Sequence, residues 1–74
     1  MANLHPSSNE VVRFLVDNGF KHVHTRGSHM IFRSADGRQR VSVPRRKEMG
    51  VGLFRAILSE AGFTVDDFTE WNTN

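Results

Sequence analysis

Apolar residues in this chain change their spacing twice, and this change limits the folds that the chain can adopt. They recur at helical spacing over residues 8–18 and again over residues 52–61, while three short runs between them alternate apolar and polar side chains. A period of two indicates a strand, and a period near 3.6 indicates a helix. The sequence therefore predicts an α+β domain with the order α-β-β-β-α.

The predicted helices have capping residues at their ends. Ser7 followed by Glu10 fits a capping box, in which each side chain binds an otherwise unpaired amide of the first turn. Gly19 stands where a left-handed C-terminal cap belongs, and Gly62 has the same place after the second helix. A further short helix is predicted after Thr64.

Tight turns are expected to join the three alternating runs into an antiparallel meander. Gly27 followed by Ser28 suits a type II′ hairpin turn, in which glycine takes the first central position. Asp36 and Gly37 mark a second tight turn. Pro44 ends the third run, because proline lacks the amide that a strand would pair.

The alternation predicts a three-stranded sheet with both helices on one face and nothing on the other. The covered face is expected to hold the apolar side chains Val23, Met30, Phe32, Val41 and Val43. The open face is expected to hold histidines and arginines: His22, His24, Arg26, His29, Arg33 and Arg40. This asymmetry makes the open face the expected place for function.

Charge is concentrated in the middle of the chain, although the net charge is only +2. From Lys21 to Lys47 there are eight bases and one acid, and after Arg55 there are four acids and no base. A basic segment of this density indicates a polyanion as partner.

The length of 74 residues suits a single domain. We expect a flexible leader at 1–6, one RNA-binding or nuclease domain at 7–63 and an acidic C-terminal extension at 64–74. The chain has no cysteine, which excludes disulfides and Cys-ligated zinc. Residues 1–20 lack the features of a signal peptide and no apolar stretch has the length of a membrane span, so a cytoplasmic location without membrane contact is expected.

His22, His24 and His29 are expected to share the open face across the first hairpin. A metal site is disfavoured because no Asp, Glu or Cys accompanies them there, and we expect neither a metal ion nor a cofactor. His22 is expected to be an exposed strand residue without a role. His24 is kept open as an assisting group.

His29 differs from the other histidines in its position. It follows the Gly27-Ser28 turn, so its backbone is held while its imidazole faces solvent beside Arg26 and Arg33. Histidine titrates near pH 6.5 and can exchange a proton at neutral pH. Guanidinium groups can hold a phosphate and stabilise the charge that develops on it. Because RNA supplies its own nucleophile, the 2′-hydroxyl, a metal-free nuclease needs little more than one base, one acid and cations around the scissile phosphate.

Four segments resemble the HicA family, small toxins of bacterial and archaeal type II toxin–antitoxin systems. They are GF at 19–20, RGSHMIF at 26–32, VSVP at 41–44 and GLFRAIL at 52–58. The resemblance spans about residues 7–63, and its most specific element is the glycine–serine–histidine turn followed by an apolar strand.

The resemblance implies a double-stranded-RNA-binding-domain-like fold and a ribosome-independent mRNA endonuclease whose active histidine is His29. It also implies a HicB-type antitoxin that covers the active face, and contact with operator DNA only through the antitoxin complex. The side chains expected to bind RNA are Arg26, Ser28, Arg33, Arg45, Arg46 and Lys47.

Two positions depart from the family pattern. Met30 stands where many members have a second histidine, and Arg45-Arg46 follows the strand-ending proline where many have a histidine. An arginine, Lys47 or His24 would then have to assist. Two alternatives to a nuclease remain open: an RNA-binding module that uses the same face without cutting, and an interaction domain whose acidic tail or helices bind protein.

Overall fold

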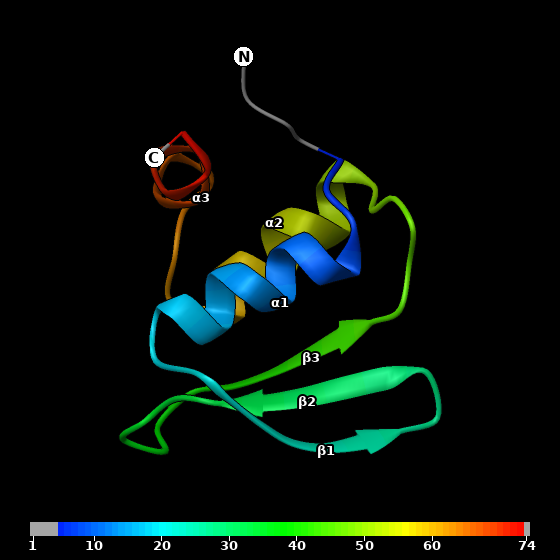
Figure 1. Cartoon of the computed structure of the whole chain (residues 1–74), viewed down its shortest axis with the longest axis vertical. Helices are drawn as coiled ribbons and strands as arrows, with labels where there is room; N and C mark the ends of the chain where they lie inside the picture. Colours follow the sequence, from blue (N-terminus) through cyan, green and yellow to red (C-terminus); the bar gives the residue numbers. More distant parts are fainter. Residues whose placement is uncertain (1–4, 74) are drawn as a thin grey trace.

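The computed structural model describes residues 5–73 as three helices and one three-stranded sheet (Figure 1). The helices are α1 (Ser8–Asp17), α2 (Val51–Ala61) and α3 (Val65–Asn72). The strands are β1 (Lys21–Arg26), β2 (His29–Arg33) and β3 (Arg40–Pro44). The α+β class and the α-β-β-β-α order are confirmed, and α3 is the short helix predicted after Thr64.

The ends of α1 and α2 follow from their capping residues. The Glu10 amide donates to Ser7 Oγ, and the Ser7 amide donates to the Glu10 carboxylate, each at 3.3 Å, which is the predicted capping box. Gly19 and Gly62 follow the helices with φ of +89° and +86°. These left-handed values favour glycine, which has no Cβ to clash with the backbone, so both helices end where predicted.

The sheet is a meander in which β2 lies between β1 and β3, with both pairs antiparallel. Gly27 has a φ of +61° whereas Ser28 has a negative φ, as a type II′ turn requires. At the second turn, the Ser34 hydroxyl and the Arg38 amide both donate to the Asp36 carboxylate, and this holds the pKa of Asp36 below its ordinary value.

A β-bulge in β1 makes two of the predicted face assignments wrong. The β1–β2 register shifts between His22 and His24, so Val23 is an inserted residue, and it is 52% exposed instead of buried. His22 pairs with Phe32, and the two ring centroids lie 5.3 Å apart. Because directly paired residues share a face, His22 lies on the helix-covered face and Lys21, opposite Arg33, lies on the open face.

All three helices lie on one side of the sheet, and the core fills the space between these layers (Figure 1). Its side chains come from the helices, from the covered face of β2 and β3 and from the connections: Val11, Phe14, Leu15, Phe20, Phe32, Val41, Val43, Met49, Phe54, Ile57, Leu58, Ala61 and Phe68. The opposite face of the sheet has no covering element within residues 5–73, as predicted (Figure 1).

The acidic C-terminal extension packs onto this core through α3. Phe68 is buried, with its ring centroid 5.3 Å from that of Phe14 and 4.9 Å from that of Phe54. Trp71 Nε1 donates to the Asp17 carboxylate at 2.8 Å. The extension therefore adds an aromatic layer to the domain, while its own acidic residues stay exposed.

The end of the expected leader is held against the segment that precedes α2. The Met49 amide donates to the Pro6 carbonyl at 2.9 Å, and His5 Nδ1 lies 3.1 Å from the Met49 carbonyl oxygen. The rest of that leader, residues 1–4, lies outside the described residues. Over residues 5–73, none of the helices combines the length and the apolar character needed to cross a membrane.

Candidate functional site

The open face of the sheet consists of three rows of residues that pair across the strands. Paired residues share a face with Cβ atoms about 5 Å apart, and successive rows lie about 7 Å apart because two strand residues separate them. In order along β2, the rows are Arg26, His29 and Pro44 (first row), His24, Ile31 and Ser42 (second row), and Lys21, Arg33 and Arg40 (third row).

His29 lies in the first row, exposed at the start of β2. Its Nδ1 lies 3.2 Å from Ser42 Oγ on β3. A hydrogen bond through Nδ1 therefore links the imidazole to the neighbouring strand. We did not predict Ser42 as a site residue. The alternation places it on the open face, but only the β2–β3 register shows that it is next to His29.

The two arginines expected beside His29 are separated by the sheet. Arg26 pairs directly with His29 in the first row. Arg33 stands four residues further along β2, about 13 Å from His29 at the rise of a strand. A phosphate at His29 therefore lies next to Arg26, and Arg33 is the more distant of the two arginines.

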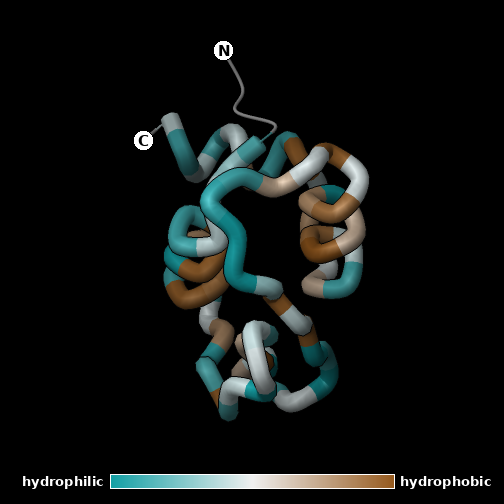
Figure 2. The backbone as a smooth tube through the Cα atoms, turned by 90° about the vertical axis from the view of Figure 1, so that its right-hand side faces the viewer, coloured by the Kyte–Doolittle hydropathy of each residue, from teal (hydrophilic) through white to brown (hydrophobic). Residues whose placement is uncertain are grey.

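Residues 45–47, the basic loop, are anchored at two points near the turn that leads to His29. The Arg45 amide donates to the Ser28 carbonyl at 2.9 Å. The Ser8 hydroxyl is buried; it accepts from the Arg46 amide and lies 2.8 Å from the Arg46 carbonyl and 3.0 Å from the Pro44 carbonyl, to one of which it donates. The loop thus has a fixed backbone and exposed side chains, and Figure 2 shows it as the hydrophilic stretch between β3 and α2.

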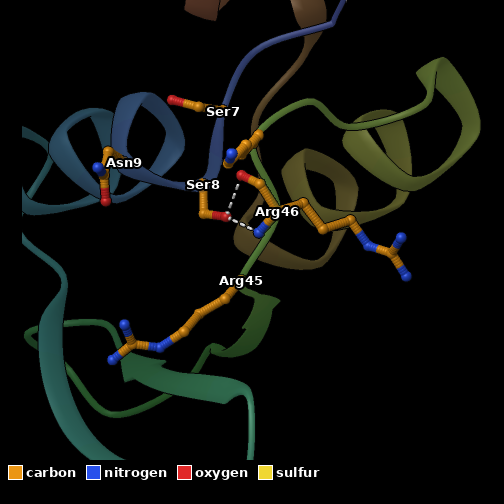
Figure 3. Close-up of a pocket in the computed structure, with 6 residues that line it drawn as sticks. Ser7, Ser8, Asn9, Arg45 and Arg46 are labelled. Carbon is orange, nitrogen blue, oxygen red and sulfur yellow. Dashed lines mark hydrogen bonds between the residues drawn. The ribbon is translucent and has the colours of Figure 1, made fainter.

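The basic loop and the start of α1 border an open hollow of about 400 Å³. Its lining residues are Ser7, Ser8, Asn9, Arg45, Arg46 and Lys47. Arg45 and Arg46 point away from each other (Figure 3), so the loop presents cations in two directions and does not close around one point.

The three histidines of the first hairpin do not gather on one face. His24 lies in the second row, diagonal to His29 at the 7–8 Å spacing typical of such neighbours. His22 lies on the other face, where its Nε2 is 2.9 Å from Thr25 Oγ1. In the part of the chain that the structure describes, no three or more His, Cys, Asp or Glu side chains come together as they would around a metal ion.

Most of the chain matches the model of a known protein family. Residues 8–63 match the family model described as the HicA toxin of bacterial toxin-antitoxin, which is more than half of the chain. No curated protein sequence matches. The matched region runs from the start of α1 to just beyond α2 and includes His29, its turn and the basic loop, whereas α3 lies outside it. The chain therefore belongs to the HicA toxin family of bacterial toxin–antitoxin systems, and this family implies an antitoxin as its partner.

Proposed function

We propose that this toxin is a metal-independent endoribonuclease that cleaves mRNA with His29 as its acid/base group. The observation that carries the proposal is an exposed imidazole on the open sheet face, paired with Arg26 and fixed through Nδ1 by Ser42. The double-stranded-RNA-binding-domain-like fold that the resemblance implies is consistent with the α-β-β-β-α order. No element of residues 5–73 covers this face, which supports the proposal that a strand of RNA binds there.

The contact with Ser42 occupies Nδ1 of His29 and leaves Nε2 as the nitrogen that faces RNA, and the mechanism that we propose has the proton on Nδ1. With the proton on Nδ1, that nitrogen donates to Ser42 Oγ and Nε2 keeps its lone pair. Nε2 then takes the proton from a ribose 2′-hydroxyl, and the oxygen attacks the adjacent phosphorus. The bond from phosphorus to the 5′-oxygen breaks, which leaves a 2′,3′-cyclic phosphate and a 5′-hydroxyl. The proton for the leaving oxygen comes from water or from protonated His24.

Cations near His29 would stabilise the charge that develops on the scissile phosphate. Arg26 is the cross-strand neighbour of His29. Arg45 follows Pro44, which also pairs with His29, and its amide is bonded to Ser28. We therefore assign the scissile phosphate to Ser28, Arg26 and Arg45, and assign Arg46 and Lys47 to the flanking strand.

The deciding experiment is RNA cleavage in EDTA by the wild type, His29→Ala and His22→Ala. Loss of a positioned acid/base group lowers rates about 10²–10⁴-fold, so we expect a loss of that size in His29→Ala only. His22→Ala is the matched control because it removes an imidazole from the covered face. Equal rates for wild type and His29→Ala would disprove the catalytic role, and loss of wild-type activity in EDTA would disprove metal independence.

The partner that we propose is a HicB-type antitoxin that covers the open face, with operator DNA bound only through the antitoxin complex. Inhibition would then follow from exclusion of RNA from His29. The alternative is a module that binds RNA on the same face without cutting it. This alternative predicts intact RNA and a salt-sensitive affinity that is unchanged in His29→Ala.

A further inference from the structure

We propose that the third row of the open face (Lys21, Arg33 and Arg40) is a second binding site for RNA phosphates, separate from the one at His29. The proposal rests on the proposed RNA-binding function and extends it. It predicts that the bound RNA strand lies along β2, and it predicts the minimum length of RNA that reaches both sites.

The first argument is the direct pairing of three like charges. Lys21 pairs with Arg33 across β1 and β2, and Arg33 pairs with Arg40 across β2 and β3. Like charges that face each other across strands destabilise a sheet. A row of three cations is therefore unfavourable for folding alone, and a bound polyanion would relieve it.

The second argument is that none of the residues that the structure describes compensates these cations. All three side chains are exposed, and among residues 5–73 none of them has a hydrogen bond or an ion pair. The acid in the nearby turn, Asp36, is occupied by the Ser34 hydroxyl and the Arg38 amide. The third row thus has its full charge available for a ligand.

The third argument is the β-bulge at Val23. Without this inserted residue, strict alternation from Arg26 would place Lys21 on the covered face and His22 on the open face. The bulge exchanges them, so that Lys21 joins Arg33 and Arg40. The bulge therefore adds a third cation to the row and moves a histidine off the open face. This exchange favours phosphate binding over metal binding.

The two sites lie at opposite ends of β2. Arg33 is about 13 Å from His29, and the second row between them contains no Lys or Arg and includes Ile31, which is only 7% exposed. A stacked strand advances about 3.4 Å per nucleotide. We consider an RNA strand that lies along β2 with its scissile phosphate at His29. The phosphate roughly four nucleotides away would then lie on the third row.

The test measures RNA binding at several salt concentrations with proteins that carry His29→Ala, so that the RNA stays intact. To this background we add either Arg33→Gln and Arg40→Gln, or Arg13→Gln and Arg55→Gln. The second pair lies on α1 and α2, is exposed and removes the same charge. Circular dichroism checks that both variants are folded.

For single strands, log K falls with log[salt] by about 0.7 per phosphate neutralised. We expect the magnitude of the slope to drop by about 1.4 when Arg33 and Arg40 are replaced, and to stay unchanged in the control. In a background with intact His29, the same replacement should raise KM for RNA of ten nucleotides and leave KM for a dinucleotide unchanged.

An unchanged slope in the Arg33 and Arg40 variant, or an equal drop in the control, would overturn the second site. An unchanged slope together with weaker binding of the antitoxin would also overturn it, because the row would then contact an acidic protein surface. If the wild type cuts no RNA but the slope drops as expected, the nuclease proposal fails and the phosphate site stands.

Discussion

The catalytic role proposed for His29 depends on which of its two ring nitrogens carries the proton. Nδ1 lies within hydrogen-bond distance of Ser42 Oγ, while the ring as a whole is exposed. A hydroxyl can both donate and accept, and the proposed mechanism requires that it accept from Nδ1, so that Nε2 is free to act as a base. In the proposed mechanism Ser42 is therefore a positioning residue that acts through His29.

Replacing Ser42 with alanine should weaken this preference without removing the imidazole. A hydrogen bond of this kind contributes about 0.5–1.5 kcal/mol, so we expect kcat in Ser42→Ala to fall by a factor of roughly 2 to 13 with KM unchanged. Ser42→Thr keeps the hydroxyl and should retain the wild-type rate. Nitrogen-15 NMR of the His29 ring reports the tautomer directly, independent of any cleavage.

In the wild type we expect the Nδ1-protonated form of the neutral His29 ring to dominate, and in Ser42→Ala we expect a shift toward the Nε2-protonated form. Identical tautomer populations in the two proteins would show that Ser42 does not position the ring. A reduced rate in Ser42→Thr as large as that in Ser42→Ala would point to a packing effect instead.

Among the elements, those with capping and turn residues were predictable and the irregular strand was not. Ser7 with Glu10, Gly19 and Gly62 act locally, through amides within one turn of the helix, so the sequence alone locates them. The faces of Val23 and His22 depend on a register between strands. A single inserted residue reverses every side chain before it, and no pattern within β1 marks the insertion.

The candidate site was predictable to a similar extent. The exposed position of His29 beside Arg26 follows from the Gly27-Ser28 turn, which sets the pairing of the two strands locally. Ser42 and the wide separation of Arg33 from His29 depend on how β2 aligns with β3 and on the length of β2. Alternation assigns residues to a face but gives no distances within that face.

The basic loop supplies an element-scale prediction through its anchor, Ser8. Ser8→Ala removes the buried hydroxyl that accepts from the Arg46 amide. A hydrogen bond to a partly buried amide contributes about 0.5–1.5 kcal/mol, so the free energy of unfolding should fall by about that amount in urea denaturation. The loop should also move more freely, so RNA affinity should fall and the Arg46 amide should exchange its hydrogen faster.

Ser7→Ala provides the matched control for Ser8→Ala. It removes the cap of α1, which costs about 1 kcal/mol, but leaves the loop anchor in place. We expect a comparable loss of stability with unchanged exchange at Arg46 and unchanged RNA affinity. If both variants show the same RNA affinity, the loop does not need Ser8 to hold its position.

At the scale of the whole molecule, the chain combines a family domain with a helix outside the family match. The match ends at residue 63, yet α3 places Phe68 against Phe14 and Phe54 in the core. A domain of this size buries a thin core, so one buried aromatic ring is a large share of its stability. We therefore expect the extension to unfold together with the sheet and the first two helices.

The chain has one tryptophan, Trp71, which lies on α3 with its ring centroid 5.4 Å from that of Phe14, so its fluorescence reports whether α3 is docked. In thermal unfolding we expect the fluorescence transition and the far-ultraviolet circular dichroism transition to coincide, as they do for one cooperative unit. Phe68→Ala should lower the free energy of unfolding by about 3–5 kcal/mol and shift both transitions together. Asp66→Asn, an exposed change on the same helix, should change the free energy of unfolding by no more than about 0.5 kcal/mol. Both transitions should then stay close to those of the wild type. A fluorescence transition well below the other would mean that α3 undocks by itself and that residues 8–63 are stable without it.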